Sequence, residues 1–244
     1  MNAIEIVDLT KRYKDVTAVK ELTLSVKDGE LFSLLGVNGA GKTTAIKMLT
    51  ALLKPTSGNA FIYGNSVVTD KNKVKELVDI SMQETAIARK LTVKENIYFY
   101  ADLNGLTKEE RENTARELFE EFDFYGVKDK QAGKLSGGWQ RKLSIALALI
   151  SRPKVLFLDE PTLGLDVIAR RELWKVIGSL KGKMTIVLTT HYMEEAEALS
   201  DRIGVMKGGK LLFIGSKSEM YAKTGKNDVE NAFISIIEGE GKDE

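Results

Sequence analysis

A run of glycines followed by a lysine and two threonines is the part of this sequence best suited to chemistry. It lies in Leu31–Thr44, LFSLLGVNGAGKTT, and has the spacing G-x-x-x-x-G-K-[ST]. Glycines let the backbone bend so tightly that several N–H groups point at one anion, and the dipole of a following helix adds to that field. Lys42 can reach the terminal phosphates of a polyphosphate, and the hydroxyl of Thr43 can ligate Mg²⁺. The predicted contact residues are Gly36, Asn38, Gly39, Ala40, Gly41, Lys42, Thr43 and Thr44.

Two adjacent carboxylates, Asp159 and Glu160, follow the continuous apolar run Val155–Leu158. Such a run is expected of a parallel strand buried on both faces, and charges at its end are costly unless they meet a cation or take part in chemistry. Beside a phosphate site, Asp159 can hold Mg²⁺ through water. Glu160 can then orient and deprotonate the water that attacks a γ-phosphate. A solvated turn is the alternative reading, and it has little weight beside a phosphate loop.

Single polar residues follow two other predicted strands. Gln83 comes just after Val78–Met82, and His191, the one histidine of the sequence, follows Thr185–Thr190. Ligands of open α/β sheets bind beyond the carboxyl ends of the strands, so both residues belong to the rim that also has Asp159. A lone glutamine is no evidence by itself, and a lone histidine is usually structural. At this rim, however, His191 could donate a hydrogen bond to a γ-phosphate.

Two weaker signals lie elsewhere. In Leu135-Ser136-Gly137-Gly138-Trp139-Gln140, Ser136 is a candidate N-cap and the glycines expose N–H groups at a helix start, which makes a second potential anion site. Taken alone, Ser-Gly-Gly is a common way to begin a helix. Tyr13 lies in the polar stretch Thr10–Asp15, which we read as a loop. It is either a surface tyrosine or an aromatic platform for a purine ring.

The elements that must position these residues read as a mixture of strands and helices. Alternation around Ile4 and in Leu22–Val26 predicts antiparallel strands with one solvated face. Leu31–Leu35 reads as a strand, followed by a helix with the sequence AIKMLTALL. Further strands are predicted at Ala60–Tyr63, Arg202–Met206 and Leu211–Ile214, and further helices at Arg170–Leu180 and Glu194–Leu199.

Residues 91–150 read as mostly helical, an insertion between the two halves of a sheet. Thr92 with Glu95, and Thr107 with Glu110, have the spacing of capping boxes. Ser216 and Glu219 have the same spacing near the end of the chain, where the last residues, GEGKDE, read as a disordered polar end.

Composition limits the possible functions. With 244 residues, the chain can form one large domain or a core with a subdomain. A net charge of +1 gives no general attraction to nucleic acid, and the absence of cysteine excludes disulfides and thiol chemistry. No signal peptide and no apolar run of about 20 residues is present in the sequence, so we expect a soluble, cytoplasmic protein that reaches a membrane only through a partner.

This order of motifs resembles the ATP-binding subunit of an ABC transporter, from about Ile4 to Ile237. The resemblance rests on the Walker A loop GVNGAGKTT, the signature LSGGWQ and the Walker B run VLFLDE. It implies the following roles: adenine stacking by Tyr13, the Q-loop glutamine at Gln83, the D-loop aspartate at Asp166 and the switch histidine at His191. The segments HYMEEAEALSDRI, GLDVIARRELW and NAFISII look most like the exporter branch that moves drugs, sodium, antibiotics or polysaccharides.

The resemblance also implies an architecture. The fold would be α/β, a P-loop NTPase (RecA-like) core with a mostly parallel sheet, an N-terminal antiparallel β subdomain and an inserted α-helical subdomain. Residues 1–244 would form a single ABC ATPase domain. Its nucleotide-binding core with the β subdomain would span 1–85 and 151–215, its helical signature subdomain 86–150, and its C-terminal helices and polar tail 216–244.

The implied mechanism uses ATP and Mg²⁺. Glu160, His191 and Gln83 would be catalytic, and Thr43, Gln83 and Asp159 would hold the metal. Two copies, or this chain and a second ABC ATPase, would face each other head to tail. The signature residues acting in trans would be Leu135, Ser136, Gly137, Gly138 and Gln140. An integral-membrane permease would contact the segment Gln83–Asn96 and hold the chain at the inner face of the cell membrane.

Two other readings remain. A non-transport ABC ATPase acting on nucleic acid or ribosomes typically has a long coiled-coil insertion or two ATPase units, and this sequence shows neither of these nor a basic stripe. We therefore expect no nucleic-acid partner. A GTPase or kinase would share only the phosphate loop, and the motif LSGGWQ and the pair Asp159–Glu160 argue against it.

Overall fold

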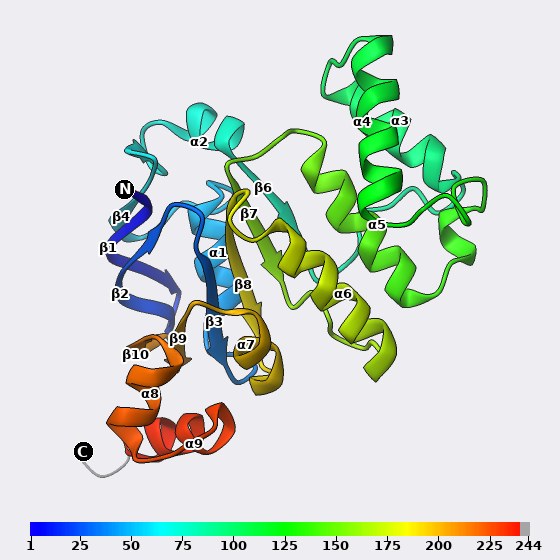
Figure 1. Cartoon of the computed structure of the whole chain (residues 1–244). Helices are drawn as coiled ribbons and strands as arrows, with labels where there is room; N and C mark the ends of the chain where they lie inside the picture. The colour runs from blue at the N-terminus through cyan, green and yellow to red at the C-terminus, as the bar shows by residue number, and fades with distance from the viewer. Residues whose placement is uncertain (240–244) are drawn as a thin grey trace.

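A computed structural model describes residues 1–239 and places them in two sheets flanked by helices (Figure 1). A four-stranded sheet has the order β2-β1-β4-β5, and a six-stranded sheet has the order β10-β9-β3-β8-β7-β6. The predicted polar end lies outside the described residues, apart from Gly239, which ends the last helix.

The six-stranded sheet forms the core. Its strands are β3 (Leu31–Gly36), β6 (Val78–Ser81), β7 (Val155–Asp159), β8 (Thr185–Thr190), β9 (Arg202–Lys207) and β10 (Lys210–Gly215). The first five pair in parallel, and only β10 is antiparallel to its neighbour. Every residue of β3, β7 and β8 is buried, as their apolar runs predict. The mostly parallel core is thus confirmed.

The antiparallel sheet contains β1 (Asn2–Tyr13), β2 (Val16–Lys27), β4 (Ser57–Ile62) and β5 (Asn65–Ser66). Its presence confirms the predicted β subdomain, but the loop predicted at Thr10–Asp15 is wrong. Strand β1 continues to Tyr13, which pairs with Val16, so the hairpin turn contains only Lys14 and Asp15. The cross-strand hydrogen bonds satisfy the backbone here, and the side chains face solvent, so their polarity is no obstacle to a strand.

Helices α1 (Lys42–Leu49) and α2 (Lys71–Leu77) contact strands of both sheets, and α7 (Met193–Leu199) contacts β3 and β8. Helix α6 (Val167–Leu180) packs beside α7. Helix α1 begins at Lys42, three residues earlier than its apolar pattern starts. The phosphate loop therefore ends directly on a helix N-terminus. Helix α2 is not predicted from the sequence, because only Val74 of its residues is buried and the apolar periodicity is weak.

The predicted helical insertion lies between the neighbouring strands β6 and β7. It contains α3 (Val93–Leu103), α4 (Lys108–Glu121), the 3₁₀ turn η1 (Ala132–Lys134) and α5 (Gly137–Leu149), and in Figure 1 it extends away from the sheets. Capping boxes begin α3 and α4 as predicted. A third begins α8 (Lys217–Thr224), which packs with α9 (Val229–Gly239) beside α7. None of the helices within residues 1–239 is both long and apolar enough to span a bilayer.

Candidate functional site

The phosphate loop surrounds a cavity of about 500 Å³ at the carboxyl end of β3. Gly39 and Gly41 have φ angles of 80° and 102°, which L side chains rarely adopt. A Cβ on Gly41 would lie 2.2 Å from the carbonyl oxygen of Ala18, so this position requires glycine. The lining residues are Ala18, Asn38, Gly39, Ala40, Gly41, Lys42, Thr43, Thr44, Gln83, Glu160, Leu163 and His191.

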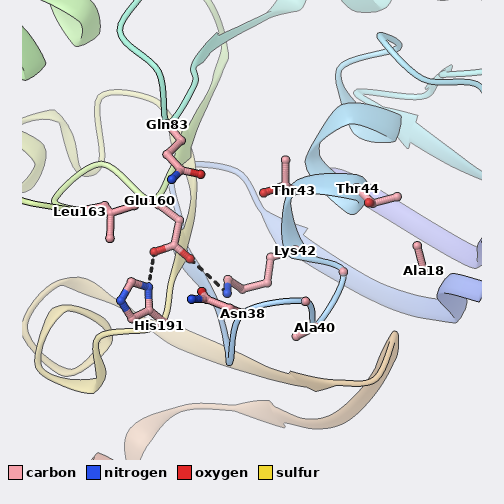
Figure 2. A pocket seen from close by; sticks show the side chains of 12 residues that line it. Ala18, Asn38, Ala40, Lys42, Thr43, Thr44, Gln83, Glu160, Leu163 and His191 are labelled. Atoms are coloured by element: carbon pink, nitrogen blue, oxygen red, sulfur yellow. Dashed lines mark hydrogen bonds and ion pairs between the residues drawn. The ribbon is translucent and has the colours of Figure 1, made fainter.

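Glu160 lies at the centre of the polar side of this cavity (Figure 2). One carboxylate oxygen is 3.1 Å from Lys42 Nζ, and the other is 2.6 Å from His191 Nδ1. The residue is only 7% exposed and has a φ of 49°, which is uncommon for a residue with a side chain. Strained backbone of this kind concentrates at functional sites. Here it turns the carboxylate from the end of β7 toward Lys42 and His191.

Asp159 lies beneath the cavity and is 1% exposed. Its Oδ1 accepts hydrogen bonds from Thr43 Oγ1 at 3.1 Å and from Thr189 Oγ1 at 2.6 Å. Its Oδ2 is buried and has no hydrogen-bond partner among residues 1–239. A buried carboxylate oxygen without a partner is unfavourable in an uncharged setting, and a divalent cation would supply the missing partner. The residues present therefore fit a Mg²⁺ ion held beside Thr43 and Asp159.

The predicted signature lies apart from this cavity. Gly137 and Gln140 line a second cavity of about 520 Å³, together with Gln83, Arg141 and other residues of the flanking loops. Ser136 occupies the N-cap position of α5, yet its hydroxyl makes no capping hydrogen bond. Within residues 1–239, no predicted signature residue lines the phosphate cavity. The phosphate loop and the signature residues thus line different cavities of one chain.

Three other predicted residues lie outside the phosphate cavity. Gly36 contributes its carbonyl oxygen, which accepts a hydrogen bond from Lys42 Nζ at 2.7 Å. Asp166 caps α6 by accepting hydrogen bonds from the backbone N–H groups of Ile168 and Ala169. Tyr13 is 46% exposed at the tip of the β1–β2 hairpin and does not line the cavity, so its stacking role stays a prediction.

Sequence reasoning missed Thr189 and Glu195. Thr189 bonds Asp159 and also accepts a hydrogen bond from the backbone N–H of Glu160 at 3.1 Å. Its signal was a polar residue at the end of an apolar buried strand. Glu195 is fully buried in α7 and accepts a hydrogen bond from Trp174 Nε1 at 3.0 Å. Burial raises the pKa of the Glu195 carboxyl above its usual value.

Comparison with known proteins finds similar sequences in one family. Residues 19–163 match the family described as "ABC transporter". "ABC transporter A family member 5" of Arabidopsis thaliana is 43% identical over 210 residues, which are 85% of this chain and 22% of that protein. "Phospholipid-transporting ATPase ABCA3" of Homo sapiens is 44% identical over 215 residues, which are 87% of this chain and 12% of that protein. The chain thus spans about a fifth and an eighth of these relatives.

Two solved structures share the fold closely. One, described as an ATP-binding subunit of an ABC transporter, superposes with a TM-score of 0.84 at 26% identity and covers 96% of this chain and 99% of that one. The other is a dimeric post-hydrolysis state of an ATP-binding cassette bound to ADP and Pi. It superposes with a TM-score of 0.77 at 25% identity and covers 87% of this chain and 98% of that one.

Proposed function

This chain belongs to the ABC transporter family, and we propose that it hydrolyses ATP to drive export across a membrane. The observation that supports this most directly is the single cavity that brings Lys42 of the phosphate loop together with Glu160 and His191. Those three side chains offer a phosphate-binding cation, a proton acceptor and a hydrogen-bonding group. That is the set that attack of water on a γ-phosphate needs.

We assign roles from this geometry. The N–H groups of the glycine loop and Lys42 bind the β- and γ-phosphates, with the N-terminus of α1 directed at them. Thr43, Asp159 and Gln83 would hold Mg²⁺, which when bound would neutralise charge on the phosphates. Glu160 accepts the proton of the attacking water, and His191 orients Glu160 and the γ-phosphate. Because Lys42 Nζ contacts Glu160 and the carbonyl oxygens of Gly36 and Val37, a phosphate bound by Nζ would replace one of these three contacts.

We further propose that two chains act as a head-to-tail pair. The signature at the start of α5 does not reach the phosphate cavity of its own chain, while the Ser136 hydroxyl makes no capping bond and remains available. A second chain could bring its signature over the ATP. The dimeric structure of the similar ATP-binding cassette supports this arrangement. Either a second copy or a related ATPase would complete the site.

The membrane partner is proposed to be an integral-membrane permease that contacts residues 83–96, a loop leading into α3. This partner would hold the chain at the cytoplasmic face of the membrane. The human relative is named as a phospholipid-transporting ATPase, which suggests a lipid or another apolar cargo. The division into a core at 1–85 and 151–215, a helical part at 86–150 and C-terminal helices is part of the same proposal.

Complementation between two inactive variants tests the shared site. Lys42→Ala removes the phosphate-binding cation, and Ser136→Arg blocks the signature. Each homodimer then has two broken sites. In the mixed dimer both defects fall into one site, and the other combines an intact phosphate loop with an intact signature. We expect the mixture to recover part of the ATPase activity, which should rise faster than linearly with protein concentration.

A matched control replaces Ser136→Arg by Ser218→Arg, a substitution at an exposed serine of α8 that lines neither cavity, and this variant should retain activity without mixing. A linear concentration dependence without recovery would contradict a shared homodimeric site. Adding candidate partner ATPases to the inactive chain would then distinguish a heterodimer from a site complete in one chain.

A further inference from the structure

Arg141 is a buried arginine that joins the signature helix to the loop containing Gln83. Its Nη1 donates a hydrogen bond to the carbonyl oxygen of Met82 at 2.7 Å, and its Nη2 donates to that of Gln83 at 2.6 Å. The residue is 5% exposed. It lies four residues after Gly137, the first residue of α5, so it is one helical turn from the signature glycines.

The geometry uses a property that only arginine has. The guanidinium is planar, and its two terminal nitrogens reach two acceptors at once in a fixed fork. Burial lowers the pKa of Arg141, while the nearby negative charges of Asp159 and Glu195 oppose that effect. A buried charge that makes two short hydrogen bonds to main-chain carbonyls fixes the backbone of the loop rather than a partner side chain.

The loop that Arg141 holds belongs to both cavities. Gln83 lines the phosphate cavity together with Thr43 and Glu160 (Figure 2). Gln83 also lines the second cavity, where Arg141, Gly137 and Gln140 are its neighbours. A displacement of the start of α5 would therefore be transmitted through Arg141 to the backbone of Gln83.

We propose that Arg141 is a positioning residue that fastens the Gln83 loop to the signature helix, so that Gln83 reaches the metal site in a fixed place. This rests on the proposed function for the assignment of Gln83 as a Mg²⁺ ligand. In the head-to-tail pair, the signature meets the ATP of one site while Gln83 serves the other. Arg141 then makes these two contacts parts of one rigid unit.

The test compares Arg141→Lys with Arg152→Lys. Lysine keeps the positive charge at position 141 but cannot bond both carbonyls as the guanidinium does. Arg152 follows the same helix, and its side chain is 71% exposed, so its substitution should change little. Two quantities are measured: hydrogen–deuterium exchange of the peptide 82–86, and the Mg²⁺ concentration that gives half-maximal ATPase activity.

For Arg141→Lys we expect faster exchange in residues 82–86 with unchanged exchange in β7 and β8. The half-saturating Mg²⁺ concentration should rise about tenfold, the effect of losing one charged hydrogen bond. Arg152→Lys should leave both quantities unchanged within about twofold. If Arg141→Lys does not fold, Arg141→Gln, which keeps one donor in a shorter side chain, replaces it.

A double-substitution cycle decides the role. In a Gln83→Ala background, adding Arg141→Lys should not raise the Mg²⁺ requirement further, because the side chain that Arg141 positions is gone. Additive effects, or exchange that increases throughout α5 and the sheet, would overturn the proposal in favour of a purely structural arginine.

Binding of a fluorescent ATP analogue in EDTA is measured in parallel. If the unsubstituted protein does not bind the analogue, the proposed function itself is contradicted.

Discussion

Lys42 and Glu160 form a buried ion pair in which Nζ lies 3.1 Å from Oε1, and both side chains are less than 10% exposed. The cation that should meet the γ-phosphate is therefore already paired with the carboxylate that should accept the proton. Because the second carboxylate oxygen contacts His191 at 2.6 Å, one glutamate connects the phosphate loop to the end of β8. Glu160 thus provides a negative charge beside Lys42.

Glu160→Gln should reduce the ATPase rate by ~10²–10⁴-fold, because an amide cannot accept the proton. It should also tighten nucleotide binding in EDTA, since Lys42 loses its competing carboxylate. With ATP and Mg²⁺, the variant should accumulate as a dimer on size exclusion. Glu194→Gln changes a glutamate that is 80% exposed and serves as the control. Near-normal turnover would remove Glu160 from the chemistry.

His191 offers a chemical test, because it is the one histidine in the sequence. An imidazole-selective reagent should modify this side chain, which is 26% exposed, and stop hydrolysis while nucleotide still binds. His191→Ala should have the same effect. Bound ATP should slow the modification, as followed by absorbance and mass. Equal modification rates with and without ATP would place His191 away from the phosphates.

Tyr13→Ala tests the predicted stacking platform. Base–aromatic stacking is worth ~1–3 kcal/mol and depends little on the base, so ATP and GTP binding should weaken alike. Tyr125, in the helical insertion, is 48% exposed against 46% for Tyr13, and Tyr125→Ala is the matched control. An effect on ATP alone, or equal small effects from both substitutions, would show that Tyr13 does not stack on the base.

Asp79 should make stability depend on pH. Its carboxylate accepts hydrogen bonds from Ile80 N at 2.7 Å and Ser151 Oγ at 2.9 Å, but burial is the larger influence and raises its pKa. The folded protein therefore keeps this proton to a higher pH than the unfolded chain does. The contribution of Asp79 to stability falls as pH rises from the ordinary aspartate pKa toward the raised one.

Asp79→Asn removes that titration and keeps a polar atom in place of each of the two carboxylate oxygens. The free energy of unfolding of the variant should therefore exceed that of the unsubstituted protein at pH 7. The difference should shrink as the pH approaches 4. Denaturant titrations at several pH values measure it. A difference that stays constant with pH would mean that the Asp79 pKa is not raised by folding.

Patterns local in sequence predicted their structures well. The capping boxes at Thr92 and Thr107 form as their spacing requires, because both partners lie within one helical turn. The apolar run Val155–Leu158 is a buried parallel strand, because burial on both faces is what such a run needs. The residues at the carboxyl ends of β7 and β8, Glu160 and His191, meet in one cavity for the same topological reason.

Other features depended on partners distant in sequence. Arg141 and the carbonyl of Gln83 are 58 residues apart, and no local pattern distinguishes an arginine that bonds backbone from one that faces solvent. The end of β1 at Tyr13 was likewise set by its pairing with Val16 in β2. The buried position of Glu195 arose from packing of α7 against Trp174 of α6, which a sequence pattern does not specify.

The phosphate loop is held in shape by backbone hydrogen bonds that link it to the β9–β10 turn and to β2. Gly209 N–H donates to the carbonyl of Ala40 at 3.1 Å, and the carbonyl of Gly209 accepts from Lys20 N–H at 2.8 Å. The β9–β10 turn thus bridges the loop to β2. If the loop became ordered only on binding, the loss of conformational entropy would lower the affinity for ATP. Here the loop loses that entropy when the protein folds, so ATP binding does not carry the cost. Substitutions that loosen the turn around Gly209 should therefore weaken ATP binding without touching a residue that contacts phosphate.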